Sequence, residues 1–213
     1  MTDTRDRLLD AAADLFYREG VNVGVEALTK AAGVSKRSMY QLFGSKDEVV
    51  AASLERIGPG YNASLLPPDG QGTPRERILH VFRVLEEVAP EPEFHGCPFV
   101  ATSVEIKSAD HPARAVARRY KDGLAAFFRR EAAAGGAADP ERVARQLTMT
   151  FDGAGAWAVM HGEGLDGQAV RMAETLLDAA GLVAEPAVGV AEQAGPQRPG
   201  TTKARPPAVG GRA

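Results

Sequence analysis

The chain contains few of the residue types that would build a disulfide framework or a membrane anchor. Among its 213 residues there is one cysteine, Cys97, so no disulfide can form within the chain. No apolar run approaches the roughly 20 residues that a transmembrane helix requires. The start of the chain, MTDTRDRLLDAAADLF, lacks the basic segment and unbroken apolar core of a signal peptide. We therefore expect a soluble, cytoplasmic protein with no membrane partner.

Acidic residues are absent from one window, although the chain as a whole has a formal net charge of −3. Residues 27–46 contain Lys30, Lys36, Arg37 and Lys46 and no aspartate or glutamate. A nucleic-acid-binding protein does not need to be basic overall, because the electric field that matters is local to the contacting face. The window is therefore a candidate phosphate-binding face, and a solvated pair of helices is the alternative interpretation.

Strand-like alternation is also absent, and apolar residues recur at helical spacing up to about residue 183. The fold is therefore predicted to be all-α. Four short helices are expected in the first fifty residues or so, and glycines at 20, 33 and 44 mark the ends of the first three. Ser35 is expected to cap the third helix and Ser45 the fourth. The first helix carries an apolar stripe of Leu8, Leu9, Ala12, Leu15 and Phe16.

The chain after these helices divides at runs rich in proline and glycine. Residues 59–74 contain four prolines and three glycines, which predicts a loop after the fourth helix. Amphipathic segments then follow up to Gly181, while residues 186–213 contain five prolines, five glycines and no aromatic residue. That composition is typical of a disordered tail. The predicted organisation is a DNA-binding domain at 1–50, a helical regulatory domain at 51–185 and a tail at 186–213.

The second and third predicted helices, joined through Gly33, have the spacing of a helix-turn-helix. In this arrangement the second helix enters the major groove with its first residues on the base edges. Lys36 and Arg37 can reach guanine acceptors or phosphates, and Gln41 can pair with an adenine edge. The hydroxyls of Ser35, Ser38 and Tyr40 suit phosphate oxygens, and Lys46 adds a cation at the start of the next helix.

The segment LLDAAADLFYREGVNVGVEALTKAAGVSKRSMYQLFGSKDEVV, residues 8–50, resembles the amino-terminal domain of the TetR family of bacterial transcriptional regulators. The later stretches GCPFV and DPERVARQLTMTFDGA resemble one branch of its regulatory domain less specifically. The resemblance implies DNA contacts at the seven residues named above, with Thr29 approaching the phosphate backbone. The chain departs from the family at Leu42, where many members have a histidine, so no contact is assigned there.

For residues 51–185 the resemblance implies a domain that binds a ligand and dimerises through its last two helices. Small residues at 153–156 would let such helices approach closely, although ordinary packing within one chain would use them equally well. An effector cavity would be mostly apolar with a few polar anchors. Its predicted lining, which could equally be plain core, is Phe82, Phe99, Phe128, Met149, Phe151, Asp152, Trp157 and Met160.

The segment FHGCPF leaves other interpretations open. His95 and Cys97 could form a thiol or metal sensor, yet a structural zinc site needs four ligands and one cysteine with scattered histidines falls short. A small helical enzyme using Cys97 is a further alternative, and a ligand carrier that has lost DNA recognition is another. The prediction is a dimeric repressor that binds a palindromic double-stranded operator and is released by a partly apolar small molecule. No metal, no cofactor and no enzymatic activity are expected.

Overall fold

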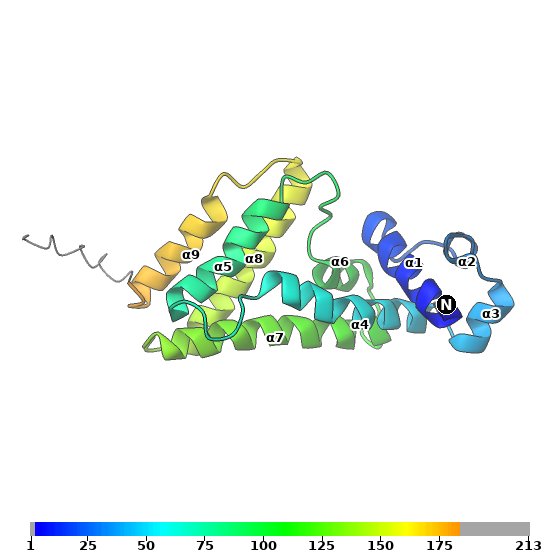
Figure 1. The fold of residues 1–213 in the computed structure, drawn as a ribbon, viewed down its shortest axis with the longest axis horizontal. Coiled ribbons are helices and arrows are strands. Elements are labelled where there is room, and N and C mark those ends of the chain that lie inside the picture. Colours follow the sequence, from blue (N-terminus) through cyan, green and yellow to red (C-terminus); the bar gives the residue numbers. More distant parts are fainter. Residues whose placement is uncertain (1–2, 184–213) are drawn as a thin grey trace, which may run out of the picture.

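The computed structural model describes residues 3–183, and this part of the chain forms nine helices and no strand (Figure 1). The predicted all-α fold is confirmed. The predicted tail at 186–213 lies outside the described residues. The helices are α1 (Thr4–Glu19), α2 (Val25–Ala32), α3 (Lys36–Leu42), α4 (Lys46–Leu65), α5 (Pro74–Val88), α6 (Pro98–Glu105), α7 (Pro112–Ala134), α8 (Pro140–His161) and α9 (Gln168–Ala179). Within residues 3–183 no helix is long and apolar enough to cross a membrane.

Helices α1 to α3 form a small head at one end of the molecule (Figure 1). Gly33 ends α2 in the left-handed conformation, at φ 64°, which glycine adopts without a steric penalty. The Ser35 hydroxyl accepts a hydrogen bond from the Ser38 amide at 3.0 Å and so caps α3 as predicted. The apolar stripe of α1 is buried together with Leu28, Met39 and Phe43. The head thus packs α3 through Met39 and Phe43 onto a hydrophobic core that it shares with α4, α6 and the start of α7.

Helix α4 is longer than the proline and glycine content of its second half predicts. The loop expected from residue 59 begins only after Leu65, because α4 continues through Pro59. A proline inside a helix cannot donate the hydrogen bond to the carbonyl four residues earlier. That carbonyl belongs to Glu55, and the Tyr120 hydroxyl of α7 donates to it at 3.4 Å. A side chain of another helix thus partly replaces the missing bond, a contact that the local sequence cannot reveal.

Gly58 provides the space in which the Tyr120 ring reaches α4. A Cβ atom at this position would lie 1.8 Å from Cζ of Tyr120. We therefore expect Gly58→Ala to push the tyrosine aside and lower the free energy of unfolding by about 1–3 kcal/mol. Gly60→Ala is the matched control, since nothing lies within 4 Å of a Cβ there and alanine favours the helix by about 0.5–1 kcal/mol. Urea denaturation should show that the free energy of unfolding falls for Gly58→Ala and rises for Gly60→Ala. Equal changes in the two variants would refute the packing role of Gly58.

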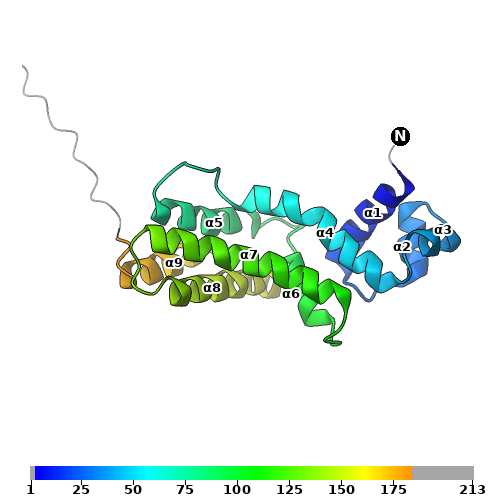
Figure 2. The same cartoon turned by 90° about the horizontal axis from the view of Figure 1, so that it is seen from below.

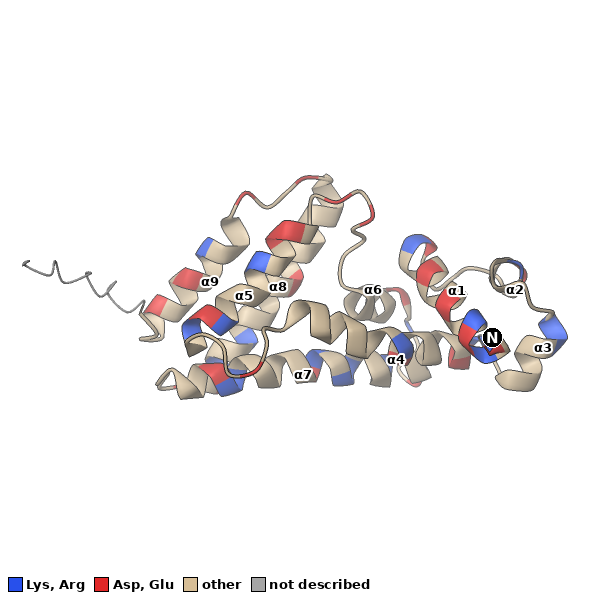
Figure 3. Ribbon diagram, viewed as in Figure 1, with Lys and Arg blue, Asp and Glu red and all other residues tan. Residues whose placement is uncertain are grey.

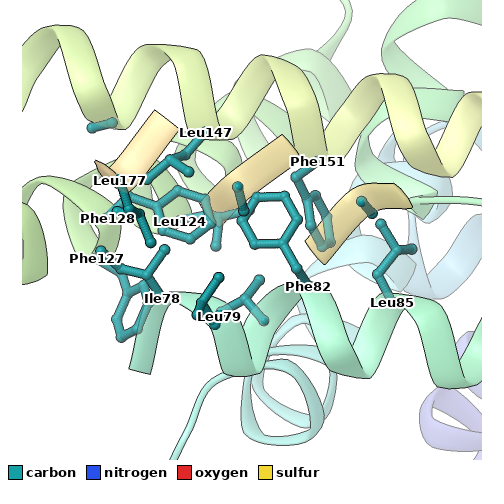
Figure 4. Packing of buried hydrophobic residues seen from close by; sticks show 14 of the residues in the cluster. Ile78, Leu79, Phe82, Leu85, Leu124, Phe127, Phe128, Leu147, Phe151 and Leu177 are labelled. Atoms are coloured by element: carbon teal, nitrogen blue, oxygen red, sulfur yellow. The ribbon is translucent and has the colours of Figure 1, made fainter. Parts of the chain in front are cut away.

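Helices α4 and α7 lie side by side along the long axis of the molecule (Figures 1 and 2). The amino-terminal half of α7 packs on α4, α6 and the head through Ala113, Val116 and Ala117. Its other half belongs to a second core shared with α5, α8 and α9. Figure 4 shows this second core, where Phe82 of α5 meets Phe128 of α7 and Phe151 of α8. The two cores are connected through α4 and α7, so a shift of these helices reaches the head.

Helix α9 is anchored to α5 by a carboxylate. Glu86 of α5 accepts hydrogen bonds from the amides of Gly167, Ala169 and Val170 at 2.8–3.3 Å. Amides in the first turn of a helix have no partner within that helix, and a negative charge there also interacts favourably with the helix dipole. The contact fixes the start of α9 beside α5.

Candidate DNA-binding surface and ligand cavity

Helix α3 presents a polar face to solvent because its apolar side is held in the core of the head. Met39 is completely buried and Phe43 is 6% exposed. Lys36, Arg37 and Gln41 are exposed on the helix, and Tyr40 is 52% exposed. The phenol of Tyr40 can donate or accept a hydrogen bond, and its ring offers an apolar face beside the cations. The helix therefore offers two cations, an amide and a phenol on one accessible element.

The hydroxyl groups predicted to bind phosphate differ in their availability. Ser35 and Ser38 bond to one another, with 2.8 Å between their Oγ atoms, and Ser35 remains exposed at the start of α3. Thr29 is only 6% exposed, and its hydroxyl donates to the carbonyls of Val25 and Glu26 at 2.9 and 3.1 Å. The structure thus places Thr29 inside α2 rather than on the accessible surface, because a threonine hydroxyl readily bonds to the preceding turn.

Helix α3 itself carries basic residues and no acidic side chain (Figure 3). Lys46 follows at the first residue of α4, next to the Ser45 cap. Arg5 of α1 adds a cation that the sequence pattern does not reveal, since its guanidinium lies 5.0 Å from the centre of the Phe43 ring. Arg5 is separated from α3 by thirty residues of chain, so only the tertiary fold brings it to this end of the head.

Four of the residues predicted to line an effector cavity are packed elsewhere. Phe82 stacks on Phe128 at 5.9 Å between ring centres and meets Phe151 edge-on at 6.0 Å. Phe99 instead belongs to the core near the head, where it stacks on Tyr120 at 4.5 Å. Asp152 forms an ion pair with Lys121. The structure therefore does not bring Phe82, Phe99, Phe128 and Asp152 together around one space.

Three further predicted lining residues, Met149, Trp157 and Met160, lie on the outer side of α8. They are 69%, 53% and 73% exposed respectively. Helix α8 buries the opposite side, which carries Leu147, Phe151 and other small or apolar residues. Met172 of α9 is also more than half exposed. The chain thus exposes large apolar side chains on its last two helices, which is typical of a surface that contacts another protein.

A cavity of about 520 Å³ opens between α4, α5, α8 and the loop that precedes α6. Of the eight residues predicted to line an effector cavity, Phe151 is the one found here. Tyr17 of α1 also lines it, so the head contributes directly to its wall. Burial raises the pKa of the Tyr61 phenol at the cavity, which keeps that hydroxyl neutral. The remaining lining residues are Ser64, Leu65, Val84, Leu85, Glu87, Val88, Glu91, Glu93, Phe94 and Gly96.

Tyr17 connects this cavity to the head. Its hydroxyl donates to the Gly96 carbonyl at 3.2 Å and accepts from the His95 amide at 3.0 Å. Just beyond α1, the Val21 amide donates to the Glu105 carboxylate at the end of α6 at 2.8 Å. The carboxyl-terminal end of α1 and the residues just after it are thus hydrogen-bonded at both ends of α6, to the loop before it and to its last residue. A displacement of the loop before α6 would be transmitted to α1 through these contacts.

The FHGCPF segment does not assemble a set of metal ligands in the part of the chain that the structure describes. Cys97 is half-buried at the start of α6, and the His95 ring packs edge-on against Tyr17 at 5.3 Å. Within residues 3–183 no group of three or more histidine, cysteine or acidic side chains is arranged to hold a metal ion. His95 therefore packs between the head and α6.

The amino-terminal sequence matches the family model described as "Bacterial regulatory proteins, tetR family" over residues 8–53. The chain is 31% identical over 130 residues to the HTH-type transcriptional repressor NemR of Escherichia coli. That match covers 59% of this chain and 65% of NemR, slightly less than two thirds of the repressor.

Two solved structures extend the similarity beyond the head. A TetR-type transcriptional regulator from Streptomyces avermitilis is 54% identical with a TM-score of 0.82, covering 84% of this chain and 99% of that protein. The reduced form of E. coli NemR is 27% identical with a TM-score of 0.69, and the alignment covers 87% of this chain and all of that one. The similarity therefore includes the helices around the cavity as well as the head.

Proposed function

The chain belongs to the TetR family of bacterial transcriptional regulators, which are not enzymes, and we propose that it is a dimeric repressor released from its operator by a small molecule. The observation that carries this proposal is α3, which exposes Lys36, Arg37, Tyr40 and Gln41 on a helix free of acidic residues. Repression itself is supported by the name of the relative NemR. A protein that only carried a ligand and did not bind DNA would have no use for this basic, acid-free face of α3.

On the DNA, α3 would lie in the major groove, with Arg37 and Lys36 at guanine edges and Gln41 at an adenine edge. Ser35, Ser38, Tyr40 and Lys46 would contact phosphates and fix the position of the helix. Arg5 would add a phosphate contact from α1. Thr29 would act indirectly, by stabilising the last turn of α2 through its hydroxyl bonds to Val25 and Glu26.

Two copies are required because one helix of seven residues reaches too few base pairs for specific binding. A dimer with twofold symmetry would place two such helices on half-sites about 34–36 Å apart. The exposed apolar side chains of α8 and α9 are the proposed interface, with Met149, Trp157 and Met160 on α8 and Met172 on α9. Residues 153–156, all glycine or alanine, would let the paired helices approach closely.

The cavity beside Tyr17 is the proposed effector site. An occupant would contact Tyr17 and Phe94 at once, and would therefore act on the loop that α1 holds through His95 and Gly96. An effector releases DNA only to the extent that it binds the DNA-incompetent arrangement more tightly. In this chain, an occupant that moves the loop before α6 would favour an arrangement in which the two heads no longer match the half-sites.

The test is a selection of bound duplexes from a random pool at near-physiological salt, followed by sequencing. We expect a near-palindrome from the wild-type protein. Met160→Asp should yield a monomer, since a buried unpaired carboxylate disfavours an apolar interface, and should reduce affinity for the selected duplex by at least about tenfold. Analytical ultracentrifugation measures the first effect and fluorescence anisotropy the second.

Val104→Asp is the matched control, because Val104 is 63% exposed on α6 and lies outside the proposed interface. It should leave both the dimer and the operator affinity unchanged. Sequence-independent binding that disappears with added salt would refute the regulator proposal. A Met160→Asp protein that remains dimeric would refute the proposed interface alone.

A further inference from the structure

The composition of the cavity wall points to the class of molecule that fits it. Aromatic side chains from four parts of the fold line the cavity, namely Tyr17, Tyr61, Phe94 and Phe151. Three carboxylates, Glu87, Glu91 and Glu93, also line it, and neither lysine nor arginine does. Aromatic faces attract cations through their quadrupole, and the carboxylates add negative charge. From this wall we propose that the effector is an amphiphilic organic cation with an apolar, preferably aromatic, body.

The carboxylates are available to such a ligand. Glu87, Glu91 and Glu93 are exposed, and none of them takes part in an ion pair formed within residues 3–183. They come from the end of α5 and the loop after it, whereas the buried wall is formed by Leu65, Leu85 and Phe151. The cavity therefore has an apolar floor and an acidic rim, which suits a ligand with an apolar body and a positively charged group.

A basic residue behind this wall, Lys121, does not cancel its charge. Lys121 of α7 lies 5.3 Å from the centre of the Phe151 ring, but it does not line the cavity and is paired with Asp152. The phenols of Tyr17 and Tyr61 are neutral near pH 7, as tyrosines ordinarily are, and burial raises the pKa of each further. The Tyr17 oxygen is already occupied by the backbone of His95 and Gly96. Tyr17 can therefore offer its ring rather than a free hydroxyl.

Three aryl probes of different charge test the inference. Tetraphenylphosphonium and tetraphenylborate share one tetrahedral shape of four phenyl rings with opposite charges, and triphenylphosphine oxide is a neutral probe with three phenyl rings. Isothermal titration calorimetry of the full-length protein without DNA should show tetraphenylphosphonium binding at least about tenfold more tightly than the other two. Removing the rim charge in Glu87→Gln, Glu91→Gln and Glu93→Gln combined should weaken the cation by about tenfold. The neutral probe should change by less than about twofold, because the shape of the cavity is retained.

The matched control combines Glu141→Gln, Glu163→Gln and Glu174→Gln, which remove the same charge outside this cavity. This control should leave the affinity for the cation unchanged. Equal binding of all three probes, absence of any cation binding, or a control that loses as much affinity as the rim variant would overturn the inference. All six positions are exposed or half-buried, so both triple variants should fold. Unchanged thermal melting curves would verify this.

The inference rests on the proposed effector site, and a second readout separates the two. Release of the selected operator fragment is followed by fluorescence anisotropy at saturating tetraphenylphosphonium. Charge-selective binding without release would support the ligand class and refute the regulatory role of the cavity. Release by the neutral probe as effectively as by the cation would support the regulatory role and refute the ligand class.

Discussion

Replacing Arg37 by alanine should weaken discrimination between the operator and unrelated DNA while leaving the fold intact. Arg37 is exposed on α3 and makes no ion pair within the described part of the chain, so its removal costs little stability. A bidentate contact to guanine contributes about 1–3 kcal/mol of binding per subunit. A dimer makes this contact in each half-site, and contributions from two distant sites add. The expected loss of binding free energy at the operator is therefore about 2–6 kcal/mol. Fluorescence anisotropy with the selected duplex and a scrambled duplex measures the difference.

Arg18→Ala is the control for this experiment, because Arg18 is an exposed arginine of the same head that pairs with Asp14 of α1. Its removal should leave the affinities for both duplexes nearly unchanged. A loss for Arg37→Ala that is equal on the two duplexes would instead make Arg37 a phosphate contact. In that case the dependence of affinity on salt should fall by about one unit of slope per lost contact.

Removing Glu131 should be among the most destabilising single changes in the helices that follow the head. Glu131 of α7 is 6% exposed and accepts a hydrogen bond from Nε of Arg77, at 3.1 Å, on α5. The Arg77 guanidinium also donates to the carbonyls of Pro68 and Gln71, which holds the loop before α5. Glu131→Ala would leave this buried guanidinium with only an exposed carboxylate, Asp69, at 3.8 Å, at a cost of about 3–5 kcal/mol. Urea denaturation followed by circular dichroism measures the loss.

Glu141 provides the comparison, since it pairs with Arg129 at the surface, where both side chains are more than half exposed. Glu141→Ala should cost no more than about 1 kcal/mol. Combining Glu131→Leu with Arg77→Met should recover part of the loss, because both charges are then removed together. If Glu131→Ala and Glu141→Ala prove equally mild, the buried pair contributes nothing beyond a surface ion pair.

The head was predictable from the sequence because its signals are local. Gly33 ends α2, Ser35 caps α3, and the spacing of Met39 and Phe43 decides which side of α3 is buried. Each of these depends on residues within about one helical turn. The exposed polar face of α3 then follows, since it is the side that the apolar residues leave to solvent. The extension of α4 beyond Pro59 was not predictable, because it involves Tyr120 on another helix.

The helices after the head were less predictable from the sequence. Periodicity identified these helices but could not tell which apolar side faces a cavity, the core or another molecule. Met149, Trp157 and Met160 share α8 with Phe151, yet they lie on its outer side while Phe151 lines the cavity. The residues that sequence reasoning missed, Tyr17, Tyr61 and Phe94, come from separate segments that meet only when the chain is folded.

By itself, then, the sequence determined the all-α fold, the helix-turn-helix and the basic, acid-free character of α3, since caps, periodicity and local charge are properties of neighbouring residues. Only the tertiary structure decided which residues surround the cavity, that Arg5 lies beside α3, and that Tyr17 holds the loop before α6. The physical reason is that a cavity and a joint between helices are made of contacts between distant segments, whose partners are selected by packing across the whole chain.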